Sequence, residues 1–209
     1  MIVKKTNSQN IWLSRQKKDI FIKLSKVKGY RSRAAYKLLD INKKFKIIKK
    51  KSKVIDLGAS PGGWTQVIAE IQNNKNEIIA IDKKPMDPIE NCRFIYNDIS
   101  NFLKCDETLQ RNYFDVVLSD MAANSSGHRF TDQINAEKIY YLAKKFALKY
   151  LAAKGNFICK FFRNSLEKTI VQEIKKSFNI VKIYKPNSSR KSSKEIYLIA
   201  IGFNNLHKD

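Results

Sequence analysis

The segment "VIDLGASPGGW", residues 54–64, constrains the fold of this chain more than any other stretch. A short β-branched run holds Asp56, the glycines Gly58, Gly62 and Gly63 follow, and the apolar residues after them recur at helical spacing. Branched residues favour strands, and glycines permit a tight turn between a strand and a helix. The segment therefore predicts a strand, a glycine turn and a helix, which is the first unit of an open α/β sheet.

Apolar runs repeat this strand pattern along the chain, and helical spacing of apolar residues separates most of them. The expected strands cover residues 53–57, 77–82, 92–96, 114–120, 156–162, 179–184 and 195–203, and expected helices follow residue 63 and cover 136–151 and 165–177. Strands that alternate with helices form mostly parallel sheets with helices on both faces. We therefore expect an α/β protein with a seven-stranded sheet and a single domain over residues 1–209.

The last two expected strands are joined by "KPNSSRKSSK", residues 185–194, which has no apolar periodicity for a crossover helix. A link of this kind joins antiparallel strands, so the final strand should begin level with the carboxyl ends of the parallel strands. Open α/β sheets keep their binding sites at those ends. Residues 1–30 and 185–194 are expected to be mobile.

A basic helix is expected ahead of the sheet, in "SRAAYKLLDINKKF" from Ser32, which is the expected N-cap. It belongs to a strongly basic region, because residues 1–53 hold 18 basic and 2 acidic residues of a chain with net charge +22. A basic face of this density attracts phosphate backbones, so the extension over about residues 1–50 predicts a nucleic-acid partner. A lysine-rich proteome would explain scattered lysines but not their clustering.

Other residue types exclude several classes of protein. No apolar run is long enough for a secretion signal or a membrane span, so we expect a cytoplasmic protein without a membrane partner. Cys92, Cys105 and Cys159 are odd in number and widely spaced, which predicts buried free thiols rather than disulfides. His128 and His207 are too few for a multi-histidine zinc site or a histidine triad, so no metal is expected.

The glycine spacing distinguishes between ligands. A dinucleotide turn has its second glycine two positions after the first, whereas three residues separate Gly58 from Gly62 here. Asp56 would repel a pyrophosphate but can accept a hydrogen bond from an ammonium group. Asp82 can accept from ribose hydroxyls and Asp98 from an adenine amino group. Together they predict an adenosine with a cationic tail, S-adenosylmethionine. The alternatives are a nicotinamide oxidoreductase and a purely structural turn.

Four segments together resemble one family: "SRAAYKL", "VIDLGASPGGW", "FDVVLSDMAAN" and "PNSSRKSSKEIYL", spread over residues 32–198. They are similar to the FtsJ-like ribosomal RNA large-subunit methyltransferase E family, which methylates a ribose 2′-oxygen. The resemblance implies a Rossmann-like S-adenosylmethionine-dependent methyltransferase fold whose last strand is antiparallel. It also implies S-adenosylmethionine as cofactor, contacted by Gly62, Trp64, Asp82, Asp98 and Asp120, with Gly58 of the same turn as a further candidate.

The resemblance further implies a catalytic tetrad on Lys37, Asp120, Lys160 and Glu195. Taken singly, Lys37 is one of many surface lysines, Lys160 could extend its ammonium out of a strand, and Glu195 could protect a sheet edge. We expect Lys160 to accept the proton of a ribose hydroxyl, helped by desolvation and by the charge of Lys37 and opposed by the charge of Asp120. Asp120 would orient Lys160 and line the cofactor pocket, while Lys37 and Glu195 set the field and the substrate position.

The implied substrate is a uridine in the A loop of 23S ribosomal RNA, within the large (50S) subunit or a late precursor, and we expect a monomer. The alternatives are a 2′-O-methyltransferase acting on transfer RNA or a messenger RNA cap, and a noncatalytic RNA-binding ribosome-assembly factor. Two departures from the family pattern affect loops. Ala123 stands where the family has proline, and "LAAKGNF", residues 151–157, lacks the usual proline and second glycine.

Overall fold

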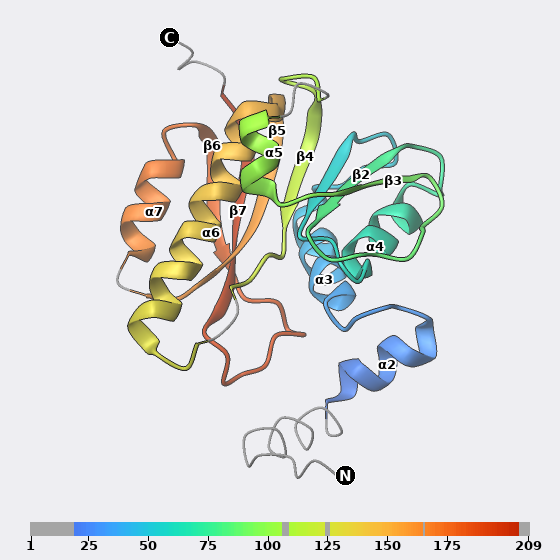
Figure 1. Ribbon diagram of the computed structural model, residues 1–209, viewed down its shortest axis with the longest axis horizontal. Coiled ribbons are helices and arrows are strands. Elements are labelled where there is room, and N and C mark those ends of the chain that lie inside the picture. The colour runs from blue at the N-terminus through green and yellow to red at the C-terminus, as the bar shows by residue number, and fades with distance from the viewer. Residues whose placement is uncertain (1–18, 106–108, 124–125, 165, 205–209) are drawn as a thin grey trace.

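The computed structural model describes residues 19–105, 109–123, 126–164 and 166–204 (Figure 1). Its centre is a seven-stranded sheet in the order β3-β2-β1-β4-β5-β7-β6. The strands are β1 (Val54–Leu57), β2 (Ile78–Asp82), β3 (Cys92–Tyr96), β4 (Phe114–Ser119), β5 (Leu151–Phe162), β6 (Phe178–Tyr184) and β7 (Glu195–Phe203). Each agrees with its predicted bounds to within one residue, except that β5 begins earlier, at Leu151.

In the described sheet, β7 is the one strand that runs opposite to all the others. The pairs β1–β2, β1–β4, β2–β3 and β4–β5 are parallel, whereas β7 lies between β5 and β6 and is antiparallel to both. Residues 185–194 therefore return the chain at the carboxyl ends of the other strands, and Glu195 begins β7 there. The predicted fold class and the antiparallel final strand are confirmed.

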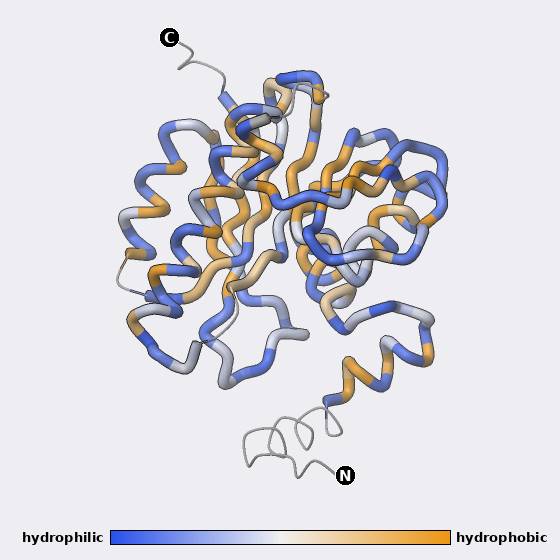
Figure 2. Tube along the Cα trace, viewed as in Figure 1, coloured by the Kyte–Doolittle hydropathy of each residue, from blue (hydrophilic) through white to orange (hydrophobic). Residues whose placement is uncertain are grey.

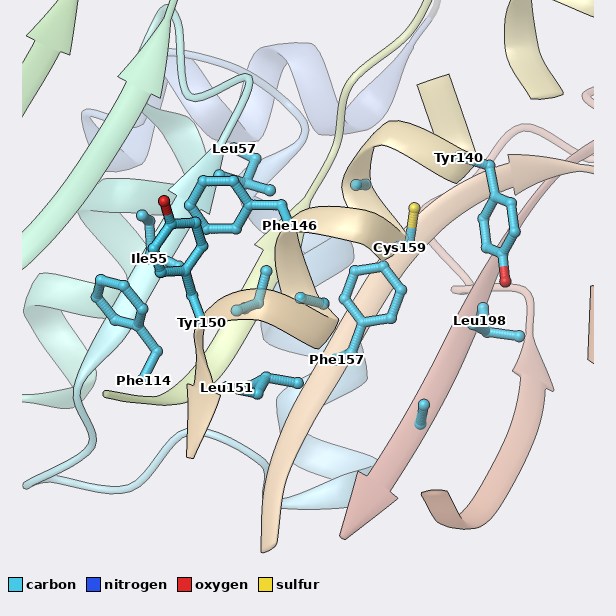
Figure 3. Packing of buried hydrophobic residues seen from close by; sticks show 14 of the residues in the cluster. Ile55, Leu57, Phe114, Tyr140, Phe146, Tyr150, Leu151, Phe157, Cys159 and Leu198 are labelled. Atoms are coloured by element: carbon cyan, nitrogen blue, oxygen red, sulfur yellow. The ribbon is translucent and has the colours of Figure 1, made fainter. Parts of the chain in front are cut away.

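Helices cover both faces of this sheet (Figure 1). One face carries α3 (Ala35–Phe45) and α4 (Gly63–Ile71), and the other carries α5 (Ile99–Cys105), α6 (Arg129–Tyr150) and α7 (Glu167–Ile174). Because successive strand residues point to opposite faces, Val116 and Leu118 pack on the first side and Val117 on the second. Figure 3 shows Phe146 and Tyr150 of α6 in the second core. In Figure 2 the strands are the most hydrophobic part of the trace.

The amino-terminal region contains a helix that the sequence pattern does not predict, α2 (Ile20–Lys28). The carboxylate of Asp19 caps it by accepting from the Phe21 N–H at 3.1 Å, and Gly29 ends it with a left-handed φ of 75°. Residues 20–28 are therefore helical where the sequence predicts no element, and residues 1–18 lie outside the described part. In Figure 1 α2 lies at the same end of the molecule as residues 185–194.

Two further segments differ in detail from the sequence pattern. Residues 185–194 form no helix or strand, as expected of a loop, yet Ser188 and Ser189 within it are buried. Ser32 is not the N-cap of α3, because the chain makes one turn first and the helix begins at Ala35, after Ala34. In the "LAAKGNF" segment Lys154 takes a φ of 65°, a conformation that glycine adopts without steric cost.

Candidate active site

Asp120, Lys160 and Tyr197 lie side by side at the carboxyl edge of the sheet. Lys160 of β5 is in register with Tyr197 of β7, and Asp120 directly follows β4, whose Ser119 pairs with Cys159. The Lys160 Nζ lies 3.0 Å from Asp120 Oδ1 and donates to the Asp120 carbonyl oxygen at 2.5 Å. The Tyr197 hydroxyl donates to the same Oδ1 at 2.7 Å. One aspartate therefore fixes both the ammonium and the phenol.

Lys37 and Glu195 form a second ion pair at this edge. Lys37 projects from α3 to the start of β7, where its Nζ lies 2.8 Å from Glu195 Oε1. The Ser189 hydroxyl donates to the same Oε1 at 3.1 Å. The Lys37 Nζ also lies 5.9 Å from the centre of the Tyr197 ring, so Tyr197 contacts one pair with its ring and the other with its hydroxyl. The structure thus brings the four predicted tetrad residues to one edge.

Charge within this cluster keeps Asp120 ionised. Burial alone would raise the pKa of Asp120, but the positive charges of Lys160 and Lys37 and the hydrogen bond from Tyr197 hold it below its ordinary value. Burial, reinforced by the negative charge of Asp120, raises the pKa of the Tyr197 hydroxyl well above its ordinary value. The phenol therefore stays a donor and the carboxylate stays an acceptor.

Tyr197 is a site residue that the sequence analysis does not identify. It is fully buried, and its ring centre lies 5.7 Å from that of Trp64, so it joins α4 to the tetrad. Within the apolar run "EIYLIAIGF" it resembles an ordinary core tyrosine. The signal that could have found it is its spacing of two residues from Glu195, which places both side chains on one face of the strand.

The glycine turn lies close to two neighbouring segments. Gly58 has a φ of 75° and Gly62 a φ of 109°, both in the left-handed region that favours glycine. A Cβ on Gly58 would overlap the Met121 side chain, and one on Gly63 would overlap the Ser32 hydroxyl. The turn is therefore fixed against the loop after β4 and against the segment before α3.

Trp64 holds α4 against α3. Its indole is 2% exposed, and the ring N–H donates to the Ala34 carbonyl at 2.8 Å. The part of Trp64 left for a ligand is its backbone in the first turn of α4. The first N–H groups of a helix have no partner within it and attract negatively charged groups.

Asp56 is fully buried at the carboxyl end of β1. The Thr65 hydroxyl donates to Asp56 Oδ2 at 2.8 Å, and Oδ1 has no hydrogen-bond partner among the described residues. Burial, together with the negative charges of Asp120 and Asp82, raises the pKa of Asp56 to about 7 against the lowering effect of the Thr65 hydrogen bond. An unpaired buried carboxyl is costly. No cation among the described residues pairs with this carboxyl.

Asp82 and Asp98 follow at the ends of β2 and β3. The Asp82 carboxylate accepts from the N–H groups of Ser60, at 2.9 Å, and Lys84, at 2.8 Å. The Asp98 carboxylate accepts from the Ser100 hydroxyl at 2.6 Å, and this bond is the main cause of its lowered pKa. Both carboxylates are thus oriented by neighbouring loops, at the same edge of the sheet as the tetrad.

The loop over residues 185–194 is tied to α2 and α3 through Asp19. Arg33 donates to the Asp19 carboxylate and to the Ser188 carbonyl, and Arg190 Nε lies 3.0 Å from Asp19 Oδ2. The Asp19 side chain is 7% exposed, so two guanidinium groups share one nearly buried carboxylate. We call Asp19, Arg33 and Arg190 the Asp19 clamp. It fixes the loop that leads into β7.

Cys159 is a buried free thiol, as predicted, and burial raises its pKa to about 12. Cys92 is free and half-buried, whereas the side chain of Cys105 and all of His207 lie outside the described part. Within the described ranges, no three His, Cys, Asp or Glu side chains gather closely enough to hold a metal ion. The helices found in those ranges include none with the length and apolar character needed to cross a membrane.

Known proteins are similar to this chain in both sequence and fold. The chain matches the FtsJ-like methyltransferase family over residues 30–203. Two similar proteins are named Ribosomal RNA large subunit methyltransferase E. The one from Rickettsia bellii is 44% identical over 95% of this chain and 90% of its own length. The one from Anaplasma phagocytophilum is 43% identical over 96% of this chain and 83% of its own length.

Solved structures agree. A Plasmodium falciparum protein described as a ribosomal RNA methyltransferase has a TM-score of 0.74 and 37% identity, covering 83% of this chain and 98% of that one. A Streptococcus mutans protein described as a methyltransferase and solved with SAH shares the fold alone, at a TM-score of 0.51 and 14% identity over 82% of this chain and 96% of that one. With matching motifs, fold and length, the chain belongs to the FtsJ-like methyltransferase family.

Proposed function

We propose that this chain transfers the methyl group of S-adenosylmethionine to a ribose 2′-oxygen of large-subunit ribosomal RNA, at a uridine in the A loop of 23S RNA. The observation that carries the proposal is the meeting of Lys37, Asp120, Lys160 and Glu195 beside the glycine turn. The names of the relatives support ribosomal RNA as the substrate class. The motif resemblance supports the 2′-oxygen and the uridine.

The residues around the glycine turn fit the cofactor. The unpaired Oδ1 of Asp56 suits an ammonium group, and the backbone at the start of α4, from Trp64, suits a carboxylate. Asp82 suits the ribose hydroxyls and Asp98 the adenine amino group, since each carboxylate is already oriented by its loop. When bound, S-adenosylmethionine would supply a methyl group activated by a positively charged sulfur.

The tetrad would prepare the ribose hydroxyl for attack. A hydroxyl is a weak nucleophile until its proton leaves, and Lys160 is the amine placed to accept that proton. Two acceptors on Asp120 fix the direction of the Lys160 Nζ. The charge of Lys37 would stabilise negative charge that develops on the ribose oxygen. Holding the reacting atoms in line supplies much of the remaining acceleration.

Exposed lysines flank the tetrad edge and would bind RNA phosphates there. They are Lys23, Lys26 and Lys28 of α2 and Lys191 and Lys194 of the loop before β7. Contacts of this kind set the register of an RNA, while its folded shape supplies specificity. A ribosomal substrate supports a cytoplasmic location for the working enzyme, and with the whole tetrad in one chain we propose that it acts as a monomer.

The first test is the Lys160→Ala variant. It should lose methyl transfer to ribosomal RNA while S-adenosylmethionine still binds by calorimetry, because the glycine turn, Asp56, Asp82 and Asp98 are unchanged. Lys182→Ala, at an exposed lysine of β6, is the matched control and should keep wild-type turnover. Normal turnover in Lys160→Ala would refute the catalytic role.

The second test identifies the substrate by mapping 2′-O-methyl positions on ribosomal RNA from cells with and without this protein. A single uridine of the A loop should lose its methyl group when the protein is absent. If a methyl group were lost from transfer RNA or from a messenger cap instead, that RNA and not ribosomal RNA would be the substrate. Full growth rescue by Lys160→Ala, without methylation, would favour a noncatalytic assembly factor.

A further inference from the structure

The basic amino-terminal quarter does not form one surface. Residues 46–53 run from the end of α3 to the start of β1, which is the edge of the sheet opposite the tetrad. Val54 pairs with Val116 of β4, which pairs with Asn156 of β5, so these residues lie at the same level along the strands. Lys53, one residue before Val54, therefore lies five residues below the level of Lys160. At about 3.3 Å per residue the two levels are about 17 Å apart along the strands.

The arginines nearest the tetrad are bonded within the protein. Arg31 donates to the carbonyls of Asp87, at 2.6 Å, and Pro88, at 2.7 Å. Arg33 belongs to the Asp19 clamp, and Lys37 is paired with Glu195. Much of the free positive charge in the described part of this quarter therefore lies away from the tetrad.

Six exposed cations cluster at the opposite edge, and we call them the amino-edge surface. They are Lys49, Lys50, Lys51, Lys53, Lys75 and Arg111, from the loops before β1, β2 and β4. In the described parts of these loops and strand starts the carboxylates are Glu77 and Asp115, so the six cations leave a positive charge there, while Asp106 and Glu107 of the loop before β4 lie outside the described part. Among the described residues, none of the six forms an ion pair with a carboxylate.

The backbone beneath these lysines is held in place. The Ser52 side chain accepts from the Lys49 N–H at 3.0 Å, and Ser52 itself is 6% exposed. The side chain of Gln72, at the end of α4, donates to the Ser52 carbonyl, and that of Asn76 donates to the Lys50 carbonyl. The ammonium groups project from this fixed turn, so ordering them on an array of anions costs less conformational entropy.

The chemistry of the surface suits a phosphate backbone rather than a protein. Protein interfaces are built around apolar anchors. The exposed large apolar side chains of the described residues are Ile20, Leu24, Val27, Tyr96, Phe130, Tyr141 and Ile180, and none belongs to the loops of the amino-edge surface. Dense lysines without such anchors are the footprint of sequence-independent nucleic-acid binding.

We propose that the amino-edge surface binds phosphates of a second structural element of the ribosomal RNA, apart from the nucleotide that is methylated. The proposal rests on the proposed function for the identity of the RNA. The strand that enters the tetrad would occupy the carboxyl edge, so binding at the opposite edge requires a folded RNA larger than the target loop. The surface would thereby select large, structured substrates over short ones.

The test removes four of the charges and compares two RNAs. The surface variant carries Lys49→Gln, Lys50→Gln, Lys51→Gln and Lys75→Gln. The control variant changes four exposed lysines of the α6 and α7 side by the same charge, Lys138→Gln, Lys145→Gln, Lys168→Gln and Lys175→Gln. Equilibrium binding is measured over a range of salt concentrations, without cofactor, to the protein-free A-loop hairpin and to a longer protein-free ribosomal RNA domain that contains it.

The surface variant should bind the longer RNA on the order of tenfold or more weakly. Its salt slope should fall by about 3, at about 0.7–0.9 for each phosphate that the variant no longer neutralises. Its binding and methylation of the hairpin should equal those of wild type, and the control should match wild type on both RNAs. The proposal is overturned by an equally weakened control, by an unchanged affinity for the longer RNA, or by a wild type that binds both RNAs alike.

Two other outcomes would refute one of the two proposals and leave the other standing. Weaker binding to whole subunits with unchanged binding to the protein-free RNA would make the partner a ribosomal protein and would refute an RNA contact. A wild-type chain that binds the longer RNA through this surface but methylates no ribosomal RNA would refute the proposed function alone. Because binding is read without cofactor, the two failures are distinguishable.

Discussion

Replacing Asp56 with asparagine should stabilise the ligand-free protein at neutral and alkaline pH. The carboxyl is fully buried, one of its oxygens has no partner among the described residues, and its pKa rises to about 7 from an ordinary 3.8. A carboxyl with a higher pKa in the folded state binds more protons there than in the unfolded state. Stability therefore falls as the pH rises through the window from about 4 to about 7.

The expected stabilisation follows from the difference between the ordinary and the folded-state pKa of Asp56. The difference between 3.8 and about 7 corresponds to about 4 kcal/mol at about 1.4 kcal/mol per pH unit. Asparagine keeps an oxygen for the Thr65 hydroxyl but places an unpaired amide where Oδ1 lies, at a cost of about 1–3 kcal/mol. The net gain of Asp56→Asn at pH 8 should therefore be about 2 kcal/mol. The difference in free energy of unfolding between Asp56→Asn and wild type should change by about 3 kcal/mol between pH 5 and pH 8.

Urea unfolding of wild type and Asp56→Asn at pH 5 and pH 8 measures this change directly, because the other titrating groups contribute equally to both proteins. Ile55→Val is the control, since trimming a neighbouring core side chain should cost about 1 kcal/mol at both pH values. A difference between wild type and Asp56→Asn that is the same at the two pH values would refute the account of Asp56. The stabilised variant should also bind S-adenosylmethionine more weakly, because it no longer has the partner proposed for the ammonium group.

Three further substitutions test contacts of the site. Gly63→Ala should lower the free energy of unfolding by about 1–3 kcal/mol, since its Cβ would overlap the Ser32 hydroxyl, and adding Ser32→Ala should restore much of that stability in urea unfolding. Tyr197→Phe should cost about 1.5–3 kcal/mol by the same assay, because it removes a hydrogen bond to the ionised Asp120; an unchanged midpoint would contradict that bond. Asp19→Asn should leave Arg33 and Arg190 without their shared charge and make residues 185–194 sensitive to limited trypsin digestion, while wild-type resistance would argue against the Asp19 clamp.

The sheet could be predicted from the sequence because each strand is a continuous apolar run with polar or glycine boundaries, as residues 195–203 illustrate. The direction of β7 followed from the short polar link before it. Helix α2 could not be predicted, because Ile20 and Val27 are 63% and 81% exposed and give no buried stripe. Its Asp19 cap is held by Arg190, which lies 171 positions away in the chain.

The site could be predicted only in part. Strand ends and motif resemblance placed the tetrad residues at one edge, where the structure brings them together. The pairing of Lys37 with Glu195 depends on which side chains face one another across α3 and β7, and no spacing in the sequence specifies that. The two-residue spacing places Tyr197 on the same strand face as Glu195, but it does not predict the hydrogen bond from Tyr197 to Asp120. A count of charges along the sequence predicts one basic surface, because the count does not say on which side of the fold each side chain lies. The fold turns Arg31 and Arg33 inward and carries Lys49 to the opposite edge.

The insertion of β7 between β5 and β6 affects the order in which a nascent chain can become active. The ribosome makes β1 to β6 before β7, so Asp120 and Lys160 emerge without Tyr197 and Glu195 beside them. Until β7 pairs, β5 and β6 also lack their shared neighbour, and Lys37 lacks a partner 158 positions later in the chain. Contacts of such long range form late in folding. With the tetrad acting as proposed, methyl transfer would therefore begin only after translation has passed residue 203 and β7 has paired.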